Sequence, residues 1–597
     1  MSNRNRSSDR SRSRTSRLIW APAATLLAGS LLVAPSAAPA TAPVGVARSG
    51  AVAWSGDSAA ARPGHVLIVL FDQMRPEYAD RFGMTNFQSV RDAGTDFRNA
   101  RLGYMGSETV ISHNVIVSGQ LPKHMGWVDE VYRDTGNLLG AGADQVHITG
   151  DLSLDNFQTL VTHEGYPKLS DYLHTARPGS KFIVVGEKSY AVESAAAGTG
   201  DIAVRLSSRK SDVSAATGCA NLGGRWRGPT GRAVPEYLSS PGPGAPGGSG
   251  ECGRYYINSD KANDYGTLAG FPSWVYPEDG NRFFPGTDAS SQAGHVGGDV
   301  WVADAAMEMM GKEDWSGMFV TLGGIDKAGH MWGADQDTDG HDCTTGAGQT
   351  HVDCAAKIAD AQFGRMLARL EQLGILDDTL IVLTADHGAT HGGSYYGKTS
   401  SGAGDSNWYW APNGVIDGGA LDTVTYNSPS PALLPLNATG NLQMSYQSTS
   451  IQAWLIDRSL PKMLEEAAVM KTLPGVMASY YRVGDHYRLV STNPMSRDER
   501  RWWSREGQRI IDGMAADNGP DVVGLLHDDV SYGAYGDHGG ASEEVQRVPV
   551  VFWQAGLDDA SPSVAFQTTD ILPTILRAMG LRPTSRMDGR ARELGDD

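Results

Sequence analysis

The run HVLIVLFD at residues 65–72 decides the fold class of this chain, because it is nearly continuously apolar and ends in a carboxylate. A strand that is buried on both faces of a parallel sheet has this composition. Similar runs recur further along the chain, as KFIVVGE (181–187), GMFVTLGGID (317–326), TLIVLTADHG (379–388) and VPVVFW (548–553). These runs predict the strands of one mainly parallel sheet.

A helical pattern lies between two of the runs. Apolar residues recur at helical spacing from Val352 to Leu373, and Gly374 closes the segment. Strands that alternate with helices predict an α/β domain. Two stretches break the alternation: residues 200–295 contain SSPGPGAPGGSGECG, and residues 390–530 are less regular and rich in Trp and Tyr. We interpret both as insertions into one domain over 65–597, with 43–64 as a linker.

Length and charge limit the classes of function. A chain of 597 residues can bury a large core and still carry insertions. A formal net charge of −18 argues against a nucleic-acid polymer or an anionic membrane surface as partner. The acidity fits a protein that holds cations, and it equally fits a protein that only needs to stay soluble.

Residues 1–42 form a separate segment. The basic run MSNRNRSSDRSRSRTSR precedes an apolar stretch that is too short and too interrupted for a secure membrane span, and PSAAPATA follows. This order predicts an export signal peptide, cleaved after Ala38, Ala40 or Ala42, and a secreted or cell-surface protein. An uncleaved N-terminal anchor is the alternative. No later stretch of the sequence is long and apolar enough to span a bilayer.

The chain has four cysteines, Cys219, Cys252, Cys343 and Cys354. An even number in an exported chain predicts disulfides. Pairing of 219 with 252 and of 343 with 354 closes the shorter loops, and it is one of three connectivities. Neither pair has the CxxC spacing of a zinc ribbon or a redox site.

Polar residues follow several of the predicted strands. Because ligands in such sheets lie beyond the carboxyl ends of the strands, these side chains are expected to converge. The set, completed by a histidine near the C-terminus, is Asp72, Asp326, His330, Asp386, His387 and His538. Three carboxylates and three imidazoles suit two divalent metals, and the mixed set favours zinc over magnesium or calcium, with other divalent metals left open.

The segment YMGSETVISHNVIVSG at 104–119 offers three hydroxyls, on Ser107, Thr109 and Ser112. A hydroxyl at the start of a helix would meet a phosphate group with helix N-terminal amides behind it. Two metals can activate an attacking oxygen and stabilise the leaving group of a phosphoryl centre. A nucleophilic hydroxyl in this segment is therefore expected.

The order and wording of these motifs resemble the alkaline phosphatase superfamily, and most closely its type I phosphodiesterase/nucleotide pyrophosphatase branch. TTDILPTILRAMGL and RMDGRA near the C-terminus are also similar to the closing helix and tail of that superfamily. The resemblance implies an α/β three-layer sandwich with a mainly parallel central sheet and inserted loops or a cap. It further implies a metal-dependent hydrolase of small-molecule phosphate esters.

The resemblance also implies roles for individual residues. The branch has its threonine nucleophile ten residues before a glycine and four before a histidine, which matches Thr109, Gly119 and His113. Thr109 would attack phosphorus, and the phosphothreonine would then be hydrolysed. We interpret His113 as a structural helix residue and not as a proton carrier, because zinc already lowers the pKa values that a general base would address. One zinc would be held by Asp326, His330 and His538, and the second by Asp72, Asp386, His387 and the Thr109 oxygen.

The substrate-binding positions depart from the family pattern. Ser112 stands where the branch has an asparagine that binds a phosphoryl oxygen, and Lys188 with Tyr190 stands where a neighbouring monoesterase branch has Lys-x-Arg. A dianionic monoester needs more positive charge than a diester, so we expect phosphodiesters or pyrophosphates, with monoesters as the alternative. A sulfatase would need a C/S-x-P-x-R frame that is missing here, and an inactive binding protein would lack metal ligands that are present.

An acidic segment beginning at Asp335 gives Asp337, Asp339 and Gly340 the spacing of a calcium loop, but its twelfth position is Gly346 in place of glutamate. A solvated loop is the default interpretation. A weakly bound Ca²⁺ at Asp335, Asp337 and Asp339 is the alternative.

Overall fold

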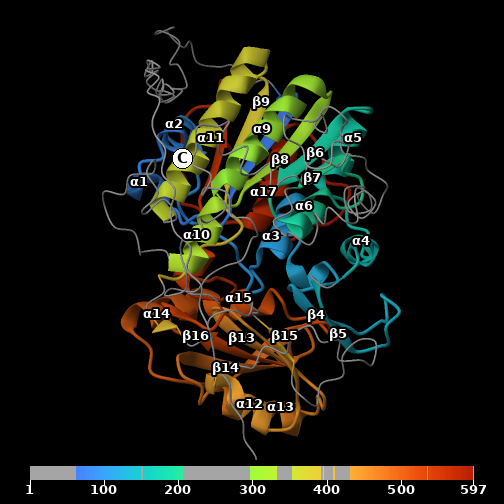
Figure 1. The fold of residues 1–597 in the computed structure, drawn as a ribbon, viewed down its shortest axis with the longest axis vertical. Helices are drawn as coiled ribbons and strands as arrows, with labels where there is room; N and C mark the ends of the chain where they lie inside the picture. Colours follow the sequence, from blue (N-terminus) through green and yellow to red (C-terminus); the bar gives the residue numbers. More distant parts are fainter. Residues whose placement is uncertain are drawn as a thin grey trace, which may run out of the picture. The chain divides into compact units, whose positions relative to one another are not determined.

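The computed structural model describes residues 62–149, 152–205, 296–332, 352–391, 394–395, 408–410, 431–533 and 536–595. Figure 1 shows the arrangement of these segments. The predicted signal peptide, the acidic segment at 335–339 and three of the four cysteines lie outside the described residues, so the signal, calcium and disulfide expectations stay predictions. Among the described residues, no helix combines the length and apolar character that a bilayer span needs.

A seven-stranded sheet lies at the centre of the α/β part, in the order β2-β18-β9-β1-β8-β6-β7. Its parallel strands are β1 (His65–Phe71), β6 (Lys181–Gly186), β7 (Ile202–Arg205), β8 (Trp315–Leu322) and β9 (Thr379–Thr384). β18 (Val550–Trp553) is antiparallel to β9, and β2 (Thr95–Asp96) is antiparallel to β18. The mainly parallel sheet predicted from the apolar runs is confirmed.

The run that decided the fold class lies in the middle of this sheet. β1 pairs with β8 on one side, Val66 opposite Gly317, and with β9 on the other, Val66 opposite Leu380. Every residue from Val66 to Phe71 is fully buried. A strand with two neighbours and two covered faces has no solvent side, which explains its unbroken apolar composition.

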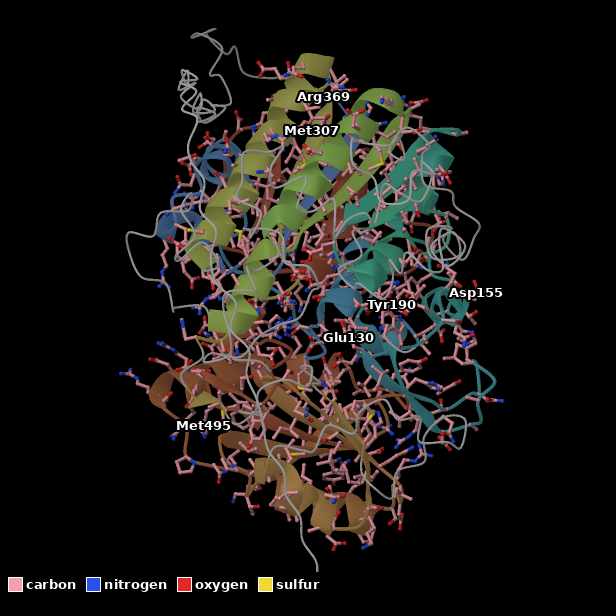
Figure 2. All side chains as sticks on the ribbon, in the orientation of Figure 1. Glu130, Asp155, Tyr190, Met307, Arg369 and Met495 are labelled. Carbon is pink, nitrogen blue, oxygen red and sulfur yellow. The ribbon has the colours of Figure 1, made fainter. Side chains whose placement is uncertain are left out.

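Helices cover both faces of the sheet. On one face Phe71 of β1 meets Phe87 of α2 (Thr85–Asp92) and Phe363 of α11 (Val352–Leu373). α9 (Val296–Lys312) and α10 (Gly324–Trp332) pack beside α11, and Arg369 of α11 donates from Nε to the carbonyl of Met307 in α9 at 3.4 Å (Figure 2).

The opposite face carries the helix of the hydroxyl-rich segment, α3 (Thr109–Ser118). His113 of α3 contacts Thr321 and Phe319 of β8, and these side chains alternate with Leu322, which pairs with Phe71 on the other face. Strand side chains alternate between faces, so α3 and α11 cover different sides. α5 (Leu169–Ala176), α6 (Ser189–Ala196) and α17 (Ile571–Ala578) accompany α3. The predicted α/β architecture is therefore confirmed.

A second, antiparallel sheet is built from the C-terminal half of the chain and lies in the lower part of Figure 1. Its order is β11 (Trp408–Trp410), β12 (Leu442–Gln447), β13 (Ser450–Leu455), β16 (Val522–Leu526), β14 (Val476–Val483) and β15 (His486–Thr492), with α13 (Leu460–Met470) packed on it. We expected less regular backbone here. The expectation missed the sheet although LQMSYQ of β12 alternates apolar with polar residues as a strand does; every position of this strand is buried, so the alternation does not mark a solvent-facing side.

Short elements complete the described part of the chain. Three two-stranded ribbons pair β3 (Ala100–Arg101) with β19 (Phe566–Gln567), β4 (Val131–Asp134) with β5 (Gln145–Ile148), and β10 (Ser394–Tyr395) with β17 (Val530–Ser531). The remaining α-helices are α1 (Tyr78–Arg81), α4 (Leu154–Thr162), α12 (Leu434–Ala438), α14 (Arg497–Trp502), α15 (Gln508–Asp512) and α16 (Glu543–Gln546).

Candidate metal centre and nucleophile

Three neighbouring strands of the central sheet deliver the carboxylates of the site. Asp72 directly follows β1, and its amide donates to the carbonyl of Leu322 at the end of β8. Asp326 lies in the first turn of α10, which follows β8, and Asp386 follows β9. All three carboxylates are fully buried. The convergence expected from parallel strand ends is what the structure has.

The first metal-ligand group is Asp72, Asp386 and His387, whose ligand atoms lie within 4.8 Å of one another. His387 Nε2 is 3.6 Å from Asp72 Oδ1 and 3.5 Å from Asp386 Oδ2. Asp386 Oδ1 accepts from the amides of Gln73 and His387 at 3.1 Å, which leaves Oδ2 facing the group.

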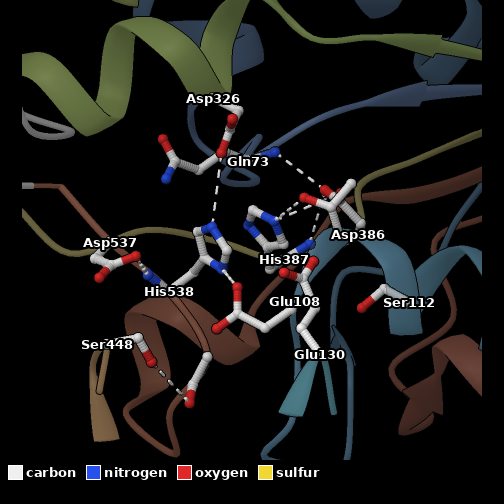
Figure 3. A network of polar contacts seen from close by, with 12 residues as sticks. Gln73, Glu108, Ser112, Glu130, Asp326, Asp386, His387, Ser448, Asp537 and His538 are labelled. Atoms are coloured by element: carbon white, nitrogen blue, oxygen red, sulfur yellow. Dashed lines mark hydrogen bonds and ion pairs between the residues drawn. The ribbon is translucent and has the colours of Figure 1, made fainter. Parts of the chain in front are cut away.

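The second set lies beside the first. His330 Nε2 is 2.9 Å from Asp326 Oδ1, and His538 Nε2 is 3.6 Å from the same oxygen and 3.3 Å from His330 Nε2. The rings of His538 and His387 stack with centroids 3.4 Å apart, so the two sets adjoin (Figure 3). The structure thus brings together all six residues that the sequence singled out.

Asp537 is a site residue that the sequence reasoning missed. It forms a third possible ligand group with His330 and His538, and its Oδ1 lies 3.8 Å from His330 Nδ1. The available signal was the tripeptide Asp-His-Gly, which occurs at 386–388 and again at 537–539. Only the histidine of the second copy was selected.

Burial and the neighbouring charges shift the pKa values of these groups. Burial, reinforced by Asp72, raises the pKa of Asp386 well above its usual range. Burial also acts on Asp326, but His330 and Lys188 hold the pKa of that carboxyl well below its usual range. Titratable groups that perturb one another in this way cluster at functional sites.

The donor set fits divalent metal ions. Three carboxylates and three imidazoles are buried together, and the Nε2 atoms of His330 and His538 face each other at 3.3 Å. Burial, with the adjacent His538, lowers the pKa of His387 well below its usual value, which keeps the imidazole neutral as ligation requires. Clusters of this composition are candidates for zinc or a similar cation.

Thr109 is the first residue of α3, which is buried over its whole length and ends at Gly119 in the left-handed conformation, with φ 66°. The Thr109 hydroxyl accepts from Lys188 Nζ at 2.8 Å and lies 3.3 Å from His387 Nε2. It therefore lies at the helix N-terminus and beside the first metal-ligand group.

The neighbouring polar residues of this segment have other surroundings. His113 is fully buried, with Nδ1 2.6 Å from the Thr109 carbonyl and Nε2 2.7 Å from Thr321 Oγ1. Burial lowers its pKa to about 3, so it stays neutral. The Ser112 hydroxyl accepts from Tyr104 at 2.9 Å, and Ser107 is fully buried.

Lys188 lies between the two metal-ligand sets. Its ammonium is 2.8 Å from Asp72 Oδ2 and 2.8 Å from Asp326 Oδ2, besides its bond to Thr109. Tyr190, two residues further on, donates its hydroxyl to the carbonyl of Leu152 at 2.6 Å and packs edge-on against Phe157. Lys188 therefore enters the site and Tyr190 is engaged elsewhere.

Acidic side chains line the side of the site that faces the second sheet. Glu108 Oε2 is 3.0 Å from His538 Nδ1, and Asp129 accepts from Gln452 of β13 at 2.6 Å. Figure 3 shows the carboxylate of Glu130 pointing into the same polar network. Burial, with Glu108 and Glu130 close by, raises the pKa of Tyr446 in β12 well above its usual value. Glu108 and Glu130 give this wall negative charge, whereas burial, reinforced by Glu108, raises the pKa of Asp129 well above its usual range.

Comparisons with known proteins indicate the class of protein to which this chain is similar. A family model described as type I phosphodiesterase / nucleotide pyrophosphatase matches residues 66–145 and 250–400. Among solved structures, alkaline phosphatase PafA is similar with a TM-score of 0.57 and 16% identity, over 89% of this chain and 99% of that one. A PafA variant with four substitutions gives 0.53 and 17%, over the same shares of the two chains.

Murine ectonucleotide pyrophosphatase / phosphodiesterase 5 is also similar, with a TM-score of 0.45 and 12% identity over 87% of this chain and 96% of that one. No curated protein matches the sequence. The predicted resemblance to the type I phosphodiesterase/nucleotide pyrophosphatase branch is confirmed over the matched residues by the family model, and the likeness to PafA shows the shared fold. The family match supports hydrolysis of phosphate esters as the class of reaction.

Proposed function

We propose that this chain is a two-zinc hydrolase of phosphate esters that uses Thr109 as its nucleophile and prefers phosphodiesters or pyrophosphates to monoesters. The observation that carries the proposal is the position of Thr109 Oγ1. It lies at the first residue of a buried helix, 2.8 Å from the Lys188 ammonium and 3.3 Å from His387. Asp72, Asp386 and His387 would hold one cation, and Asp326, His330 and His538 the other.

The surroundings of Thr109 suit attack on phosphorus. The amides at the start of α3 point toward the space in front of the hydroxyl, where phosphate oxygens would bind. Lys188 orients Oγ1 and adds a positive charge. His113 is neutral and bonded at both nitrogens, so it supports the helix and moves no proton. Bound divalent cations would lower the pKa of a hydroxyl and neutralise charge on the phosphoryl oxygens.

The charge around the site supports the preference for diesters. Lys188 has no arginine beside it, because Tyr190 occupies the second position of the clamp and bonds to Leu152. Glu108 and Glu130 add negative charge on the wall opposite. A monoester carries one more negative charge than a diester and would be disfavoured by that wall.

A phosphomonoesterase is the second candidate. It is favoured by Lys188, which reaches the nucleophile as a monoesterase clamp would, and by the fold shared with an alkaline phosphatase. Sulfate ester hydrolysis and an inactive binding protein are the weaker alternatives.

A rate comparison tests the reaction class. Purified protein is assayed on an aryl phosphodiester, an aryl phosphate monoester and an aryl sulfate, each with Zn²⁺ and after chelation. We expect the diester to have the highest kcat/KM, the sulfate none, and chelation to abolish turnover. If no phosphorus substrate turns over with zinc bound, the proposal fails.

The nucleophile has a matched pair of variants. Thr109→Ala should abolish turnover, whereas Ser107→Ala, two residues away in the same segment, should leave most of it. Thr109→Ser keeps a hydroxyl and should retain part of the rate. Turnover by Thr109→Ala with loss in Ser107→Ala would move the nucleophile to Ser107.

The preference itself is tested at position 190. Tyr190→Arg would rebuild a Lys-x-Arg pair and should shift the ratio of monoester to diester turnover by about tenfold towards the monoester, which is about 1.4 kcal/mol. Tyr190→Phe removes only the hydroxyl bond and should leave the ratio unchanged. Equal ratios in both variants would exclude this position as the determinant.

Export of the protein rests on the sequence of residues 1–42. N-terminal sequencing of protein recovered from outside the cytoplasm should begin after Ala38, Ala40 or Ala42. A mature protein that keeps the basic run would contradict cleavage.

A further inference from the structure

A cavity of about 490 Å³ lies apart from the metal centre. Its walls come from the loop that precedes α5, from α5 itself, from the end of α6 and from the C-terminal loop around residues 581–584. Neither Thr109 nor any of the metal-ligand residues lines it. Its volume is in the range of pockets that hold small molecules.

Lys168 is a cation built into this wall. Lys168 is only 4% exposed, and its Nζ donates to the carbonyl of Val161 at 3.1 Å. The ammonium also lies 4.6 Å from the centre of the Tyr166 ring, which lines the same cavity. Burial lowers the pKa of Lys168 to about 8, against the opposing effect of Asp171, so at pH 7 the group is still mostly charged. An ammonium has three N–H donors, and the carbonyl takes one of them.

Among the other polar groups of the cavity, a hydrogen-bond donor remains available, whereas the carboxylate acceptors are already occupied. The Tyr172 hydroxyl oxygen accepts from the amide of Thr584 at 3.3 Å, which keeps its own hydrogen available. Asp171 is the acidic residue of the lining, and both of its oxygens are engaged, by the Lys168 amide and by Thr199 Oγ1, each at 2.8 Å. Arg582 adds an exposed guanidinium at the rim.

A ligand that is complementary to the donor groups of this cavity must supply hydrogen-bond acceptors and negative charge. Lys168, Tyr172 and Arg582 offer donors, and charge-assisted bonds to phosphate or carboxylate oxygens are the strongest that such donors make. The rings of Tyr166 and Tyr172 offer flat apolar surface to the rest of the molecule. The cavity is also linked to the nucleophile helix, because Tyr166 donates its hydroxyl to Asn114 Oδ1 of α3 at 3.0 Å.

We propose that this cavity is a second ligand site, which binds the phosphate group of a small molecule through Lys168 and Tyr172. The body of a phosphate ester would lie against the two tyrosine rings, and free orthophosphate would use the same donors without filling the cavity. The proposal does not depend on the reaction proposed for the metal centre.

Binding stoichiometry tests the site without relying on catalysis. Phenylphosphonate is the probe, because its carbon–phosphorus bond is not an ester and its ring can meet the tyrosines. Calorimetric titration of the zinc-loaded protein should give two binding events per chain. Lys168→Met should remove one event and leave the other, and Tyr172→Phe should weaken the same event by about tenfold. If the metal centre bound no phosphonate, the wild-type protein would show one binding event per chain and Lys168→Met would show none. The two proposals can therefore fail separately.

A chemical footprint localises the second event. Lys168 should be acylated by a small lysine reagent, and phenylphosphonate should slow that acylation at least fivefold in peptides analysed by mass spectrometry. Lys188 in the same digest reports occupancy of the metal centre. Orthophosphate should protect Lys168 more weakly than phenylphosphonate if an ester is the natural ligand, and equally if free phosphate is.

The proposal is overturned by a single binding event that Lys168→Met leaves intact, or by protection of Lys188 with none at Lys168. Lys168→Arg keeps the charge and should retain the second event at reduced affinity. This conservative variant separates loss of a ligand contact from a general loss of folding, which circular dichroism would report in Lys168→Met.

Discussion

Two segments of the metal centre share the tripeptide Asp-His-Gly but have different surroundings. Residues 386–388 follow β9 of the central sheet, and residues 537–539 lie beyond β17, next to the second sheet. In both, the aspartate accepts from the following histidine amide, at 3.1 Å for Asp386 and 3.0 Å for Asp537. The local backbone arrangement is therefore alike.

The difference lies in what each segment meets. Asp386 Oδ2 faces the first metal-ligand group, whereas Asp537 Oδ2 accepts from the Ser531 hydroxyl at 3.4 Å. His387 has its pKa lowered by burial, whereas Glu108 overcomes burial and raises the pKa of His538 well above its usual value. In the proposed metal centre the first copy would then supply a pair of ligands, and the second copy would supply His538 as a ligand with Asp537 orienting it.

The largest effect is expected when each of the two aspartates is replaced separately by asparagine. Asp386→Asn should lower kcat/KM by about a thousandfold, or about 4 kcal/mol, with loss of bound metal, because it removes a charged ligand. Asp537→Asn should cost only about ten- to a hundredfold, as expected for a residue that supports a ligand. Metal content by elemental mass spectrometry and kcat/KM on the diester measure both.

Equal losses of metal in the two variants would contradict the distinction and make Asp537 a direct ligand. A normal metal content in Asp386→Asn would exclude that residue from the first metal-ligand group.

The same contrast explains what the sequence could predict. Asp72 and Asp386 end apolar runs, so a pattern that identifies buried parallel strands also places their carboxylates at one edge of the sheet. Asp537 follows no such run, and its loop is expected beside His330 only through the family resemblance, which selected His538 and not Asp537. Lys188, in the turn after β6, was predicted only through its resemblance to a Lys-x-Arg pair, and Glu108, which precedes α3, was not predicted because it reaches the centre by tertiary packing that has no local signal.

The six-stranded sheet was missed for a related reason. β12 pairs with β13, but its remaining partner β11 is distant in sequence, and β13 pairs with β16 across about seventy residues. Such pairing depends on non-local contacts, which the alternation within a single strand such as LQMSYQ does not specify.

The next largest effect concerns a buried carboxyl outside the metal centre. Glu466 of α13 is fully buried in the core of the second sheet, and burial raises its pKa to about 7. The folded protein then holds a proton that the unfolded chain releases near its ordinary pKa of 4.5. Stability therefore falls as pH rises from about 4.5 to about 7, and it stays low above that range.

Glu466→Gln should raise the free energy of unfolding by about 2 to 3 kcal/mol at pH 8 and leave it unchanged near pH 4.5, measured by urea denaturation. Glu465→Gln is the matched control, because Glu465 is the next residue along the chain and its carboxylate is exposed and pairs with Lys462. A gain that is the same at both pH values would show that charge burial is not its cause. This experiment distinguishes two kinds of buried carboxyl. Asp326 is charged because cationic side chains lie beside it, whereas Glu466 is accommodated in the core by being protonated.

The smallest effect is expected at Glu108, whose carboxylate distinguishes His538 from His387. Glu108→Gln keeps the shape of the side chain but removes the charge 3.0 Å from His538 Nδ1. At high pH, where His538 is neutral with or without Glu108, the variant should bind zinc about tenfold more weakly, because the glutamate raises the basicity of the imidazole. At low pH the wild-type ligand must first lose a proton that Glu108 stabilises, and the variant need not, so the two affinities should converge as pH falls. Zinc titration against a chelator at pH 6, 7.5 and 9 measures this convergence. A gap that stays constant over the series would mean that Glu108 acts on the geometry of His538 and not on its charge.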